Sequence, residues 1–172
     1  RKHMPSTSHH TSASARQAQS RRSAAQSAIT LLKADHKEVS DLAERFERAR
    51  APQKKKIAAT ICRMLTIHAT IEEEIFYPAV REAADDELDE LLNEAKVEHE
   101  SVKDLIAQIE AMLQRSGDEG MFEAKVKVLA EYVKHHVREE EREMFPLVRD
   151  TDLDLKALGE RLQARKQELL AG

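Results

Sequence analysis

One short pattern occurs twice in this sequence and limits the folds that the chain can adopt. The copies are residues 68–78, HATIEEEIFYP, and residues 136–146, HVREEEREMFP. Each copy has a His, a Glu four residues later, and an aromatic residue followed by Pro at the same offsets. On a helix, residues four apart lie on one face, so the imidazole and the carboxylate point the same way. A pair of this kind can hold a metal ion.

Apolar residues recur every three or four positions in four long segments, which indicates four amphipathic helices. We expect these helices over about residues 25–50, 53–84, 86–115 and 121–148. Pro78 lacks a backbone donor, so we expect a kink near Glu74–Phe76 in the second helix. The composition agrees, because the chain has only four Gly and four Pro among 172 residues. The predicted fold class is all-α.

The two ends of the chain differ from this central region. Residues 1–25 have no large apolar residue after Met4, so we expect a disordered tail. Residues 150–172 carry leucines at helical spacing, so we expect a short amphipathic helix packed on the outside. The expected organisation is a tail, a four-helix bundle over residues 26–149 and a C-terminal helix.

Charged residues of both signs are mixed along the chain. There are 28 Lys and Arg and 32 Asp and Glu, for a formal net charge of −4. Because this surface offers no broad basic face, we expect no nucleic-acid partner. No run approaches the roughly 18 apolar residues that span a bilayer, so we expect no membrane partner and a cytoplasmic protein. The single Cys62 is expected to be a buried, unreactive thiol.

Each expected helix carries one His on its apolar stripe. The first and third helices repeat an acidic residue before that His, in Asp35-His36 and Glu98-His99. The sequence thus contains two similar helical hairpins, and short connections favour antiparallel neighbours. We therefore expect an up-down-up-down four-helix bundle with polar residues in its interior. The candidate metal ligands there are His36, His68, Glu72, His99, His136 and Glu140.

A single His on an apolar stripe is more often a hydrogen-bonded core residue than a metal ligand. Burying two unpartnered carboxylates costs several kcal/mol, however, and neutral imidazoles do not offset that charge. The full set therefore favours a metal site. Its nitrogen and oxygen ligands suit Fe, Mn or Zn, and six side chains suit two ions. We expect one ion on His36 and His68, the other on His99 and His136, and both Glu as bridges.

The doubled motif, with a lone His before each copy, resembles the hemerythrin family in its bacterial HHE cation-binding branch. The similarity covers about residues 27–148. It implies the hemerythrin bundle and two oxo- or hydroxo-bridged iron ions that bind O2 or related small molecules, with Zn or Mn as weaker alternatives. Ferritin-like di-iron bundles instead space Glu and His by three residues.

The sequence departs from the oxygen-carrying members of that family. Those members have a second His one turn from the lone His of the third helix, whereas Ala95 and Lys103 flank His99 at that spacing here. Their bridging Asp follows the fourth-helix His by five residues, whereas Glu140 follows His136 by four. Four His make the two metal sites nearly equivalent. This favours reactions of peroxide or O2 over reversible O2 transport.

The leading hypothesis is a di-iron protein that binds or reacts with O2, peroxide or NO, with peroxide disproportionation as its candidate activity. One alternative is a non-catalytic module that senses, stores or buffers iron, O2 or NO. Another is a zinc site that only stabilises the bundle. No catalytic residue is assigned, and we expect a monomer or weak homodimer.

Four further residues lie close to the candidate ligands in the sequence. His135 has a Glu at the same spacing as the motif, but the apolar stripe favours His136 as the ligand. Tyr132, one turn earlier, is a candidate to approach the metals, although such a Tyr more often packs with its hydroxyl satisfied. Glu73 and Glu141 follow the two motif Glu; we expect them to be solvated, with a contact to the ligands as the alternative.

Overall fold

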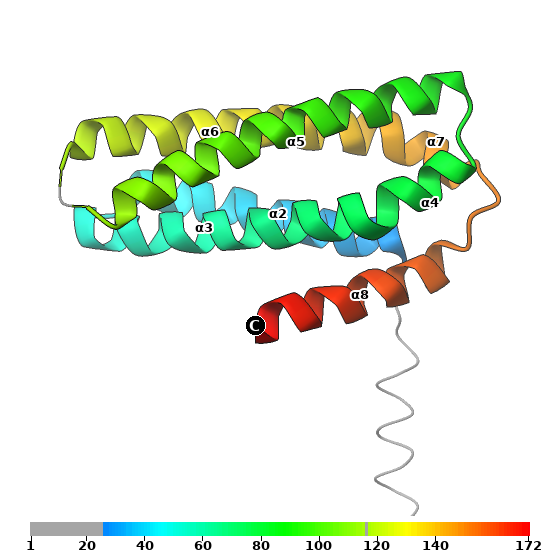
Figure 1. The fold of residues 1–172 in the computed structure, drawn as a ribbon, viewed down its shortest axis with the longest axis horizontal. Helices are drawn as coiled ribbons and strands as arrows, with labels where there is room; N and C mark the ends of the chain where they lie inside the picture. The colour runs from blue at the N-terminus through cyan, green and yellow to red at the C-terminus, as the bar shows by residue number, and fades with distance from the viewer. Residues whose placement is uncertain (1–25, 116) are drawn as a thin grey trace, which may run out of the picture.

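A computed structural model of the chain describes residues 26–115 and 117–172. Within these ranges there is no strand, and four long helices run antiparallel to their neighbours along the chain (Figure 1). They are α2 (Ala28–Arg48), α3 (Ala51–Ile71), α5 (Asp86–Leu113) and α6 (Glu119–Glu139). The predicted all-α four-helix bundle is confirmed. The expected disordered tail lies outside the described residues.

The long helices begin where the sequence provides start signals. Three of them have an N-cap side chain that accepts a hydrogen bond from the backbone N–H three residues later, namely Ser27, Asp85 and Asp118. Such caps satisfy N–H groups that have no partner inside the helix. Helix α3 has Pro52 in its first turn instead, where no intrahelical donor is needed. These signals keep the connections short, and short connections make consecutive helices antiparallel neighbours.

Both motif helices widen into a π-helical turn that begins at the motif Glu. Turn η1 (Glu72–Phe76) leads into α4 (Tyr77–Glu82), and η2 (Glu140–Met144) leads into α7 (Phe145–Arg149). In each turn a backbone N–H bonds to the carbonyl five residues earlier. Pro78 and Pro146 follow directly, and a Pro cannot supply the hydrogen bond that a regular α-helix requires. The distortion expected at Glu74–Phe76 is therefore a π turn, and a second one occurs in the other half.

Two apolar clusters fill the bundle, one towards each end. The first joins the start of α2 and α5 to α4 and α7, with Phe76 and Phe145 fully buried in it. The second joins the end of α2 and α5 to the first halves of α3 and α6, around Phe46 and Phe122. The six candidate ligands lie between these clusters along every helix. The bundle therefore has a polar layer across its middle, with apolar packing on both sides.

The last helix, α8 (Leu155–Ala171), packs against α2, α3 and η1 (Figure 1). Leu158 and Leu162 are buried in the first apolar cluster. Gly159 lies between them, and its backbone touches the residues that precede α2. The expected amphipathic C-terminal helix is thus present from Leu155, and its leucines give it a fixed place on the bundle.

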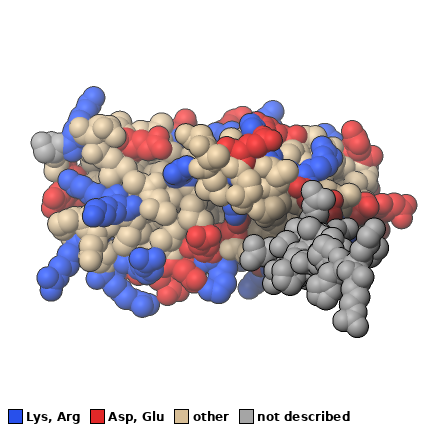
Figure 2. Space-filling view, turned by 90° about the horizontal axis from the view of Figure 1, so that it is seen from below, with Lys and Arg blue, Asp and Glu red and all other residues tan. Residues whose placement is uncertain are grey.

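The surface mixes charges of both signs. On the face shown in Figure 2, Lys and Arg side chains are interspersed with Asp and Glu, and neither sign forms a large area of its own on that face. Cys62 is buried, as expected. None of the helices in the described ranges has the length and apolarity needed to cross a bilayer. The expected cytoplasmic location and oligomeric state stay predictions.

The close approach of Gly159 gives a test of how α8 is held. A Cβ at this position would lie 2.1 Å from the backbone oxygen of Gln26 and 2.8 Å from the backbone nitrogen of Ala28. We expect Gly159→Ala to lower the free energy of unfolding by about 1–3 kcal/mol, because the added methyl group forces two backbones apart. Urea unfolding followed by circular dichroism measures this loss.

Gly120→Ala is the matched control, because the same change in the first turn of α6 meets only the side chain of Asp118, at 3.4 Å. It should leave stability unchanged or raise it slightly, since Ala favours a helix over Gly. Equal stability of the two variants would contradict the tight contact at Gly159.

Candidate metal centre

Six polar side chains meet in the middle of the bundle and are almost completely shielded from solvent. Glu72 is 0% exposed and Glu140 1% exposed, at the starts of η1 and η2. The four His are buried as well, one each on α2, α3, α5 and α6. All six candidate ligands named from the sequence therefore lie in one cluster.

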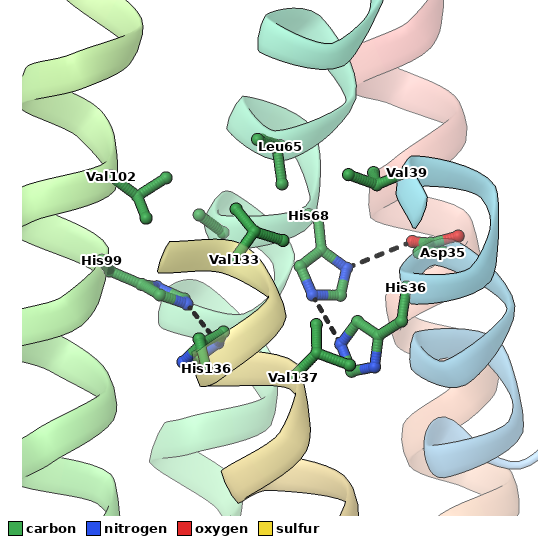
Figure 3. A pocket seen from close by; sticks show the side chains of 11 residues that line it. Asp35, His36, Val39, Leu65, His68, His99, Val102, Val133, His136 and Val137 are labelled. Atoms are coloured by element: carbon green, nitrogen blue, oxygen red, sulfur yellow. Dashed lines mark hydrogen bonds and ion pairs between the residues drawn. The ribbon is translucent and has the colours of Figure 1, made fainter. Parts of the chain in front are cut away.

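The four imidazole rings form two pairs whose Nε2 atoms face each other (Figure 3). The Nε2 atoms of His36 and His68 are 3.2 Å apart, and those of His99 and His136 are 3.1 Å apart. Each pair joins the two helices of one hairpin. This is the pairing that the sequence predicts for the two metal sites.

Each of the two buried Glu reaches both His pairs. Glu72 has Oε1 3.2 Å from Nε2 of His68 and Oε2 3.4 Å from Nε2 of His99. Glu140 has Oε2 3.2 Å from Nε2 of His36 and 3.5 Å from Nε2 of His136. A carboxylate that reaches both pairs is positioned as a bridge between them.

The outward-facing nitrogen of every ring contacts a second carboxylate. The Nδ1 contacts are His36 with Glu141 at 2.9 Å, His68 with Asp35 at 3.4 Å, His99 with Glu73 at 2.9 Å, and His136 with Glu98 at 2.7 Å. A carboxylate accepts, so Nδ1 carries the proton and donates, an assignment made from the bonding partners. In the neutral ring, Nε2 then presents a lone pair to the interior, as in His ligands of metal sites.

The four outer carboxylates connect the helices in a closed ring. Asp35 on α2 holds the His of α3, and Glu73 on η1 holds the His of α5. Glu98 on α5 holds the His of α6, and Glu141 on η2 holds the His of α2. Each helix thus fixes the ring of the next helix. The orientation of all four imidazoles depends on the assembled bundle.

Every outer carboxylate also has a basic partner. Within the bundle Lys33 pairs with Glu141 at 3.3 Å and Lys103 with Glu73 at 2.6 Å, and the ring of His135 contacts Glu98 at 3.2 Å. The fourth partner is Lys166, which comes from α8 and bonds to Asp35. These partners help to keep the outer carboxylates ionised and available to accept from the rings.

Tyr77 is the one phenol that enters the cluster. Its hydroxyl donates to Oε1 of Glu140 at 2.8 Å, and it lies 3.4 Å from Glu72 Oε2 and 3.3 Å from His99 Nε2. Burial raises the pKa of Tyr77 well above its usual value, and the charges of Glu140 and Glu72 raise it further. The phenol therefore stays protonated. In the other half Phe145 takes this place and stacks on the ring of His36, 5.9 Å between centroids.

The charges of the cluster depend strongly on one another. Burial alone would raise the pKa of Glu72, but the neighbouring His68 and His99 hold it well below its usual value. Burial likewise lowers the pKa of His68, and the charge of Glu72 with the bond to Asp35 raises it to about 10. For His136, Glu140 and Glu98 outweigh burial and raise the pKa to about 9. The carboxylates thus require positive charge beside them.

The donor set fits a metal better than it fits protons alone. Glu72 Oε1 and Glu140 Oε2 are fully buried and have no hydrogen-bond partner, although ring nitrogens approach each of them at 3.2 Å without hydrogen-bond geometry. The inner ring nitrogens and the two unpartnered carboxylate oxygens all face the same space. Two groups of side chains could each hold an ion, one of them His36, His68, Glu72 and Glu140 and the other Glu72, His99 and His136.

A small cavity lies beside the four rings. It has a volume of about 20 Å³, and its remaining wall is mainly apolar, with Val102 and Val133 opposite the His side chains (Figure 3). A space of this size holds about one water-sized molecule. A surface cleft of about 330 Å³ between α2 and α6 shares His36 and Val137 with it. The cleft and the inner cavity therefore adjoin at these side chains.

The four further candidates named from the sequence differ in whether they contact the buried cluster. His135 is exposed, and Arg138 donates to its Nδ1 at 2.9 Å, so the choice of His136 for the buried cluster agrees with the structure. The candidate Tyr132 is wrong, because its side chain is 51% exposed on the surface and the phenol in the cluster belongs to Tyr77. Glu73 and Glu141 are partly exposed, at 32% and 26%, and each also accepts from a buried His, so the alternative of a contact to the ligands holds for both.

Four neighbours of the candidate ligands were missed in the sequence. Asp35 and Glu98 directly precede the lone His of each half, and this parallel placement was the available signal. Tyr77 stands at the aromatic offset of the first motif, but the equivalent residue of the second motif is Phe145, so the repeat did not mark its hydroxyl. Lys166 had no local signal, because it lies 131 residues from its partner.

Comparison with known proteins agrees with this geometry. The family model described as the hemerythrin HHE cation binding domain matches residues 27–148. A Nostoc protein named DNA nickase is 32% identical over 122 residues, 70% of this chain and 33% of that protein. Uncharacterized proteins of Mycobacterium bovis and Mycobacterium tuberculosis are 31% identical over 108 residues, 61% of this chain and 62% of theirs. The chain thus spans a third of the first relative and under two thirds of the others. No solved structure matches significantly.

The phenol of Tyr77 provides a test of the cluster in metal-free protein. Tyr77→Phe removes the donor to Glu140 and leaves a buried carboxylate oxygen without a partner. We expect a loss of about 1–3 kcal/mol in the free energy of unfolding, measured by urea unfolding in the presence of a chelator. Tyr132→Phe, the same change on the surface, should leave stability unaltered. Identical unfolding of both variants would show that the Tyr77 hydroxyl bears no structural role.

Proposed function

This chain belongs to the hemerythrin family of HHE cation-binding domains, and from that premise we propose that its buried cluster holds two iron ions that bind or react with O2, peroxide or NO. In this proposal His36 and His68 bind one ion, and His99 and His136 bind the other. The two buried carboxylates, Glu72 and Glu140, would each contribute to both ions. The remaining polar groups hold these ligands in place.

The observation that carries the proposal is the convergence of ligand atoms in a dry interior. Two pairs of ring nitrogens approach to 3.2 and 3.1 Å, and their outer nitrogens are already committed to carboxylates. Two carboxylate oxygens at the same place have no hydrogen bond. Such an arrangement is unfavourable without a cation, because these two buried oxygens have lost water and gained no donor. Two divalent or trivalent ions would neutralise the carboxylates and take both oxygens as ligands.

The choice of iron rests on the ligand set and the family. Imidazole and carboxylate ligands accept Fe, Mn and Zn, and the absence of thiolate among the six makes a purely structural zinc site less favourable. Two adjacent iron ions would supply a place for a small molecule and two electrons for its reduction or disproportionation. Elemental analysis distinguishes iron from the weaker alternatives, Zn and Mn.

The protein side chains around this site would act on the small molecule in two ways. The Tyr77 hydroxyl, hydrogen-bonded to Glu140, is a protonated group within reach of both carboxylates and of His99. It is positioned to donate a hydrogen bond to a bound oxygen species. The apolar wall of the cavity, which includes Val102 and Val133, excludes charged molecules because it offers them no partner. Together these features favour small uncharged oxygen species.

Metal content tests the proposal directly. Protein purified without added metal should contain two irons per chain and absorb in the near ultraviolet and blue. His136→Ala should lose at least one of them, whereas Lys134→Ala, at a position of α6 that is 78% exposed, should keep both. Elemental analysis together with the optical spectrum gives the result. Tightly held zinc alone, with no iron uptake on anaerobic reconstitution, would rule out the redox function.

The same preparations separate an enzyme from a binding module. Steady O2 evolution from hydrogen peroxide, lost in Glu72→Ala, would support peroxide disproportionation. Reversible binding of NO or O2 without turnover would support the sensing, storage or buffering module instead. Both outcomes keep the di-iron site and differ only in the reaction.

A passage from the cleft to the inner cavity gives a further prediction. Val137 borders both the inner cavity and the cleft, so Val137→Phe should narrow the passage between them. We expect NO, an uncharged ligand, to bind the ferrous form of the variant about tenfold more slowly, a barrier increase of about 1.4 kcal/mol. Anaerobic stopped-flow absorption measures the rate. Val128→Phe, on the exposed side of α6, is the control and should bind NO at the wild-type rate. An unchanged rate in both variants would place the entry route elsewhere.

A further inference from the structure

The cation that pairs with Asp35 comes from a helix outside the four-helix bundle. The other three outer carboxylates have partners from the bundle itself: a Lys of α2 for Glu141, a Lys of α5 for Glu73, and His135 of α6 for Glu98. Asp35 takes its cation from Lys166 of α8. This helix begins at Leu155, beyond the residues 27–148 that the family model matches. One part of the metal centre therefore depends on a helix outside the family domain.

Asp35 is also the least solvent-exposed of the four outer carboxylates. Its side chain is 7% exposed, whereas those of Glu98, Glu141 and Glu73 are 24%, 26% and 32% exposed. An ion pair at a solvated carboxylate is readily replaced by water and salt. Water and salt cannot replace the cation of a carboxylate that is buried as deeply as Asp35, so removing Lys166 leaves a buried charge without its compensating cation. Removing Lys166 should thus disturb Asp35 more than removing Lys103 disturbs Glu73.

Helix α8 is fixed so that Lys166 reaches Asp35. Leu158 and Leu162 anchor it in the first apolar cluster. Arg165, next to Lys166, holds both carboxylate oxygens of Glu74 at 2.7 and 3.2 Å. Glu74 lies in η1, the π turn that begins with the bridging Glu72. The helix therefore contacts the centre at two adjacent points, both on the side of the His36–His68 pair or its bridge.

We propose that α8 is a positioning element of the metal centre, in which Lys166 holds Asp35 and Asp35 holds the ring of His68. The inference rests on the proposed metal site and adds to it that the two halves retain metal unequally. With α8 docked, the His36–His68 half has a complete set of partners. When Lys166 is removed, Asp35 no longer orients His68, and this half loses its metal first.

The other half does not depend on α8. There the residue equivalent to Asp35 is Glu98, and its partner is His135 of α6, the helix that also carries the candidate ligand His136. No residue of α8 is among the recorded polar contacts of that pair in the described part of the chain. The effect of Lys166 should therefore be confined to one of the two ions. Because coupling between sites is reciprocal, metal in the His36–His68 half should in turn hold α8 more firmly.

The test follows the release of ferrous ions to a chromogenic chelator from anaerobically loaded, full-length protein. Lys166→Met removes the charge and keeps the length of the side chain. We expect one of the two ions to leave about tenfold faster than in the wild type, in line with the effect of removing an outer partner from a metal-binding His. The second ion should leave at the wild-type rate. Lys166→Arg, which restores a cation, should return release of the first ion towards normal.

Two further variants give the comparison its meaning. Lys156→Met makes the same change at an exposed position of α8 and should leave both rates unaltered. Lys103→Met removes the cation of Glu73, the most solvated outer carboxylate, and should have a smaller effect than Lys166→Met. Circular dichroism and thermal unfolding check that each variant folds with α8 intact.

The outcomes separate this inference from the proposed function. Release from Lys166→Met that matches the wild type, or that is faster for both ions equally, overturns the positioning role while leaving the metal centre standing. Failure of Lys166→Arg to slow the release also overturns it, because the charge would then not be the cause. A wild-type chain that takes up no metal overturns both proposals together.

Discussion

The convergence of four imidazole rings and two carboxylates at the centre of the bundle is the constraint on which the remaining structure depends. The inner ring nitrogens and the two carboxylates point into one water-free space, and each ring has its other nitrogen committed to an outer carboxylate. Carboxylates gathered in this way repel one another unless positive charge lies between them. The apolar clusters on both sides keep water out and so increase that repulsion. The fold thus holds together two buried carboxylates, each with one oxygen that no hydrogen bond satisfies.

The π turns allow each motif to supply an inner carboxylate, which faces the Nε2 atoms of the rings, and an outer carboxylate, which accepts from the Nδ1 of a ring. Glu72 and Glu73 are consecutive, yet both contact His99, the first at its inner nitrogen and the second at its outer nitrogen. The turn that contains them is widened ahead of Pro78. Local widening of a helix often occurs at functional sites, because it redirects side chains without ending the helix. Here the Pro of the motif has a structural consequence that reaches the candidate ligands.

The two halves of the bundle are similar in sequence but differ in their surroundings. The phenol of Tyr77 lies beside the His99–His136 pair, whereas the apolar ring of Phe145 stacks on His36 of the other pair. Asp35, beside the His36–His68 pair, receives Lys166 from α8, whereas Glu98, beside the His99–His136 pair, contacts His135 within the bundle. The four candidate His ligands therefore lie in two unlike surroundings. The differences come from residues outside the repeated His and Glu positions.

The sequence by itself determined the helices, the antiparallel bundle and the six side chains that meet in its core. Helical periodicity is a local property, so the spacing of apolar residues predicted which face each His would occupy. Only the tertiary structure decided the outer ring, the choice of Tyr77 over Tyr132, and the contact of Lys166 with Asp35. These contacts join different helices, and they depend on how far each helix is rotated about its axis when the apolar clusters pack. No local spacing records that rotation, which is why a Lys near the C-terminus and an Asp in the first described helix could be joined only by the folded chain.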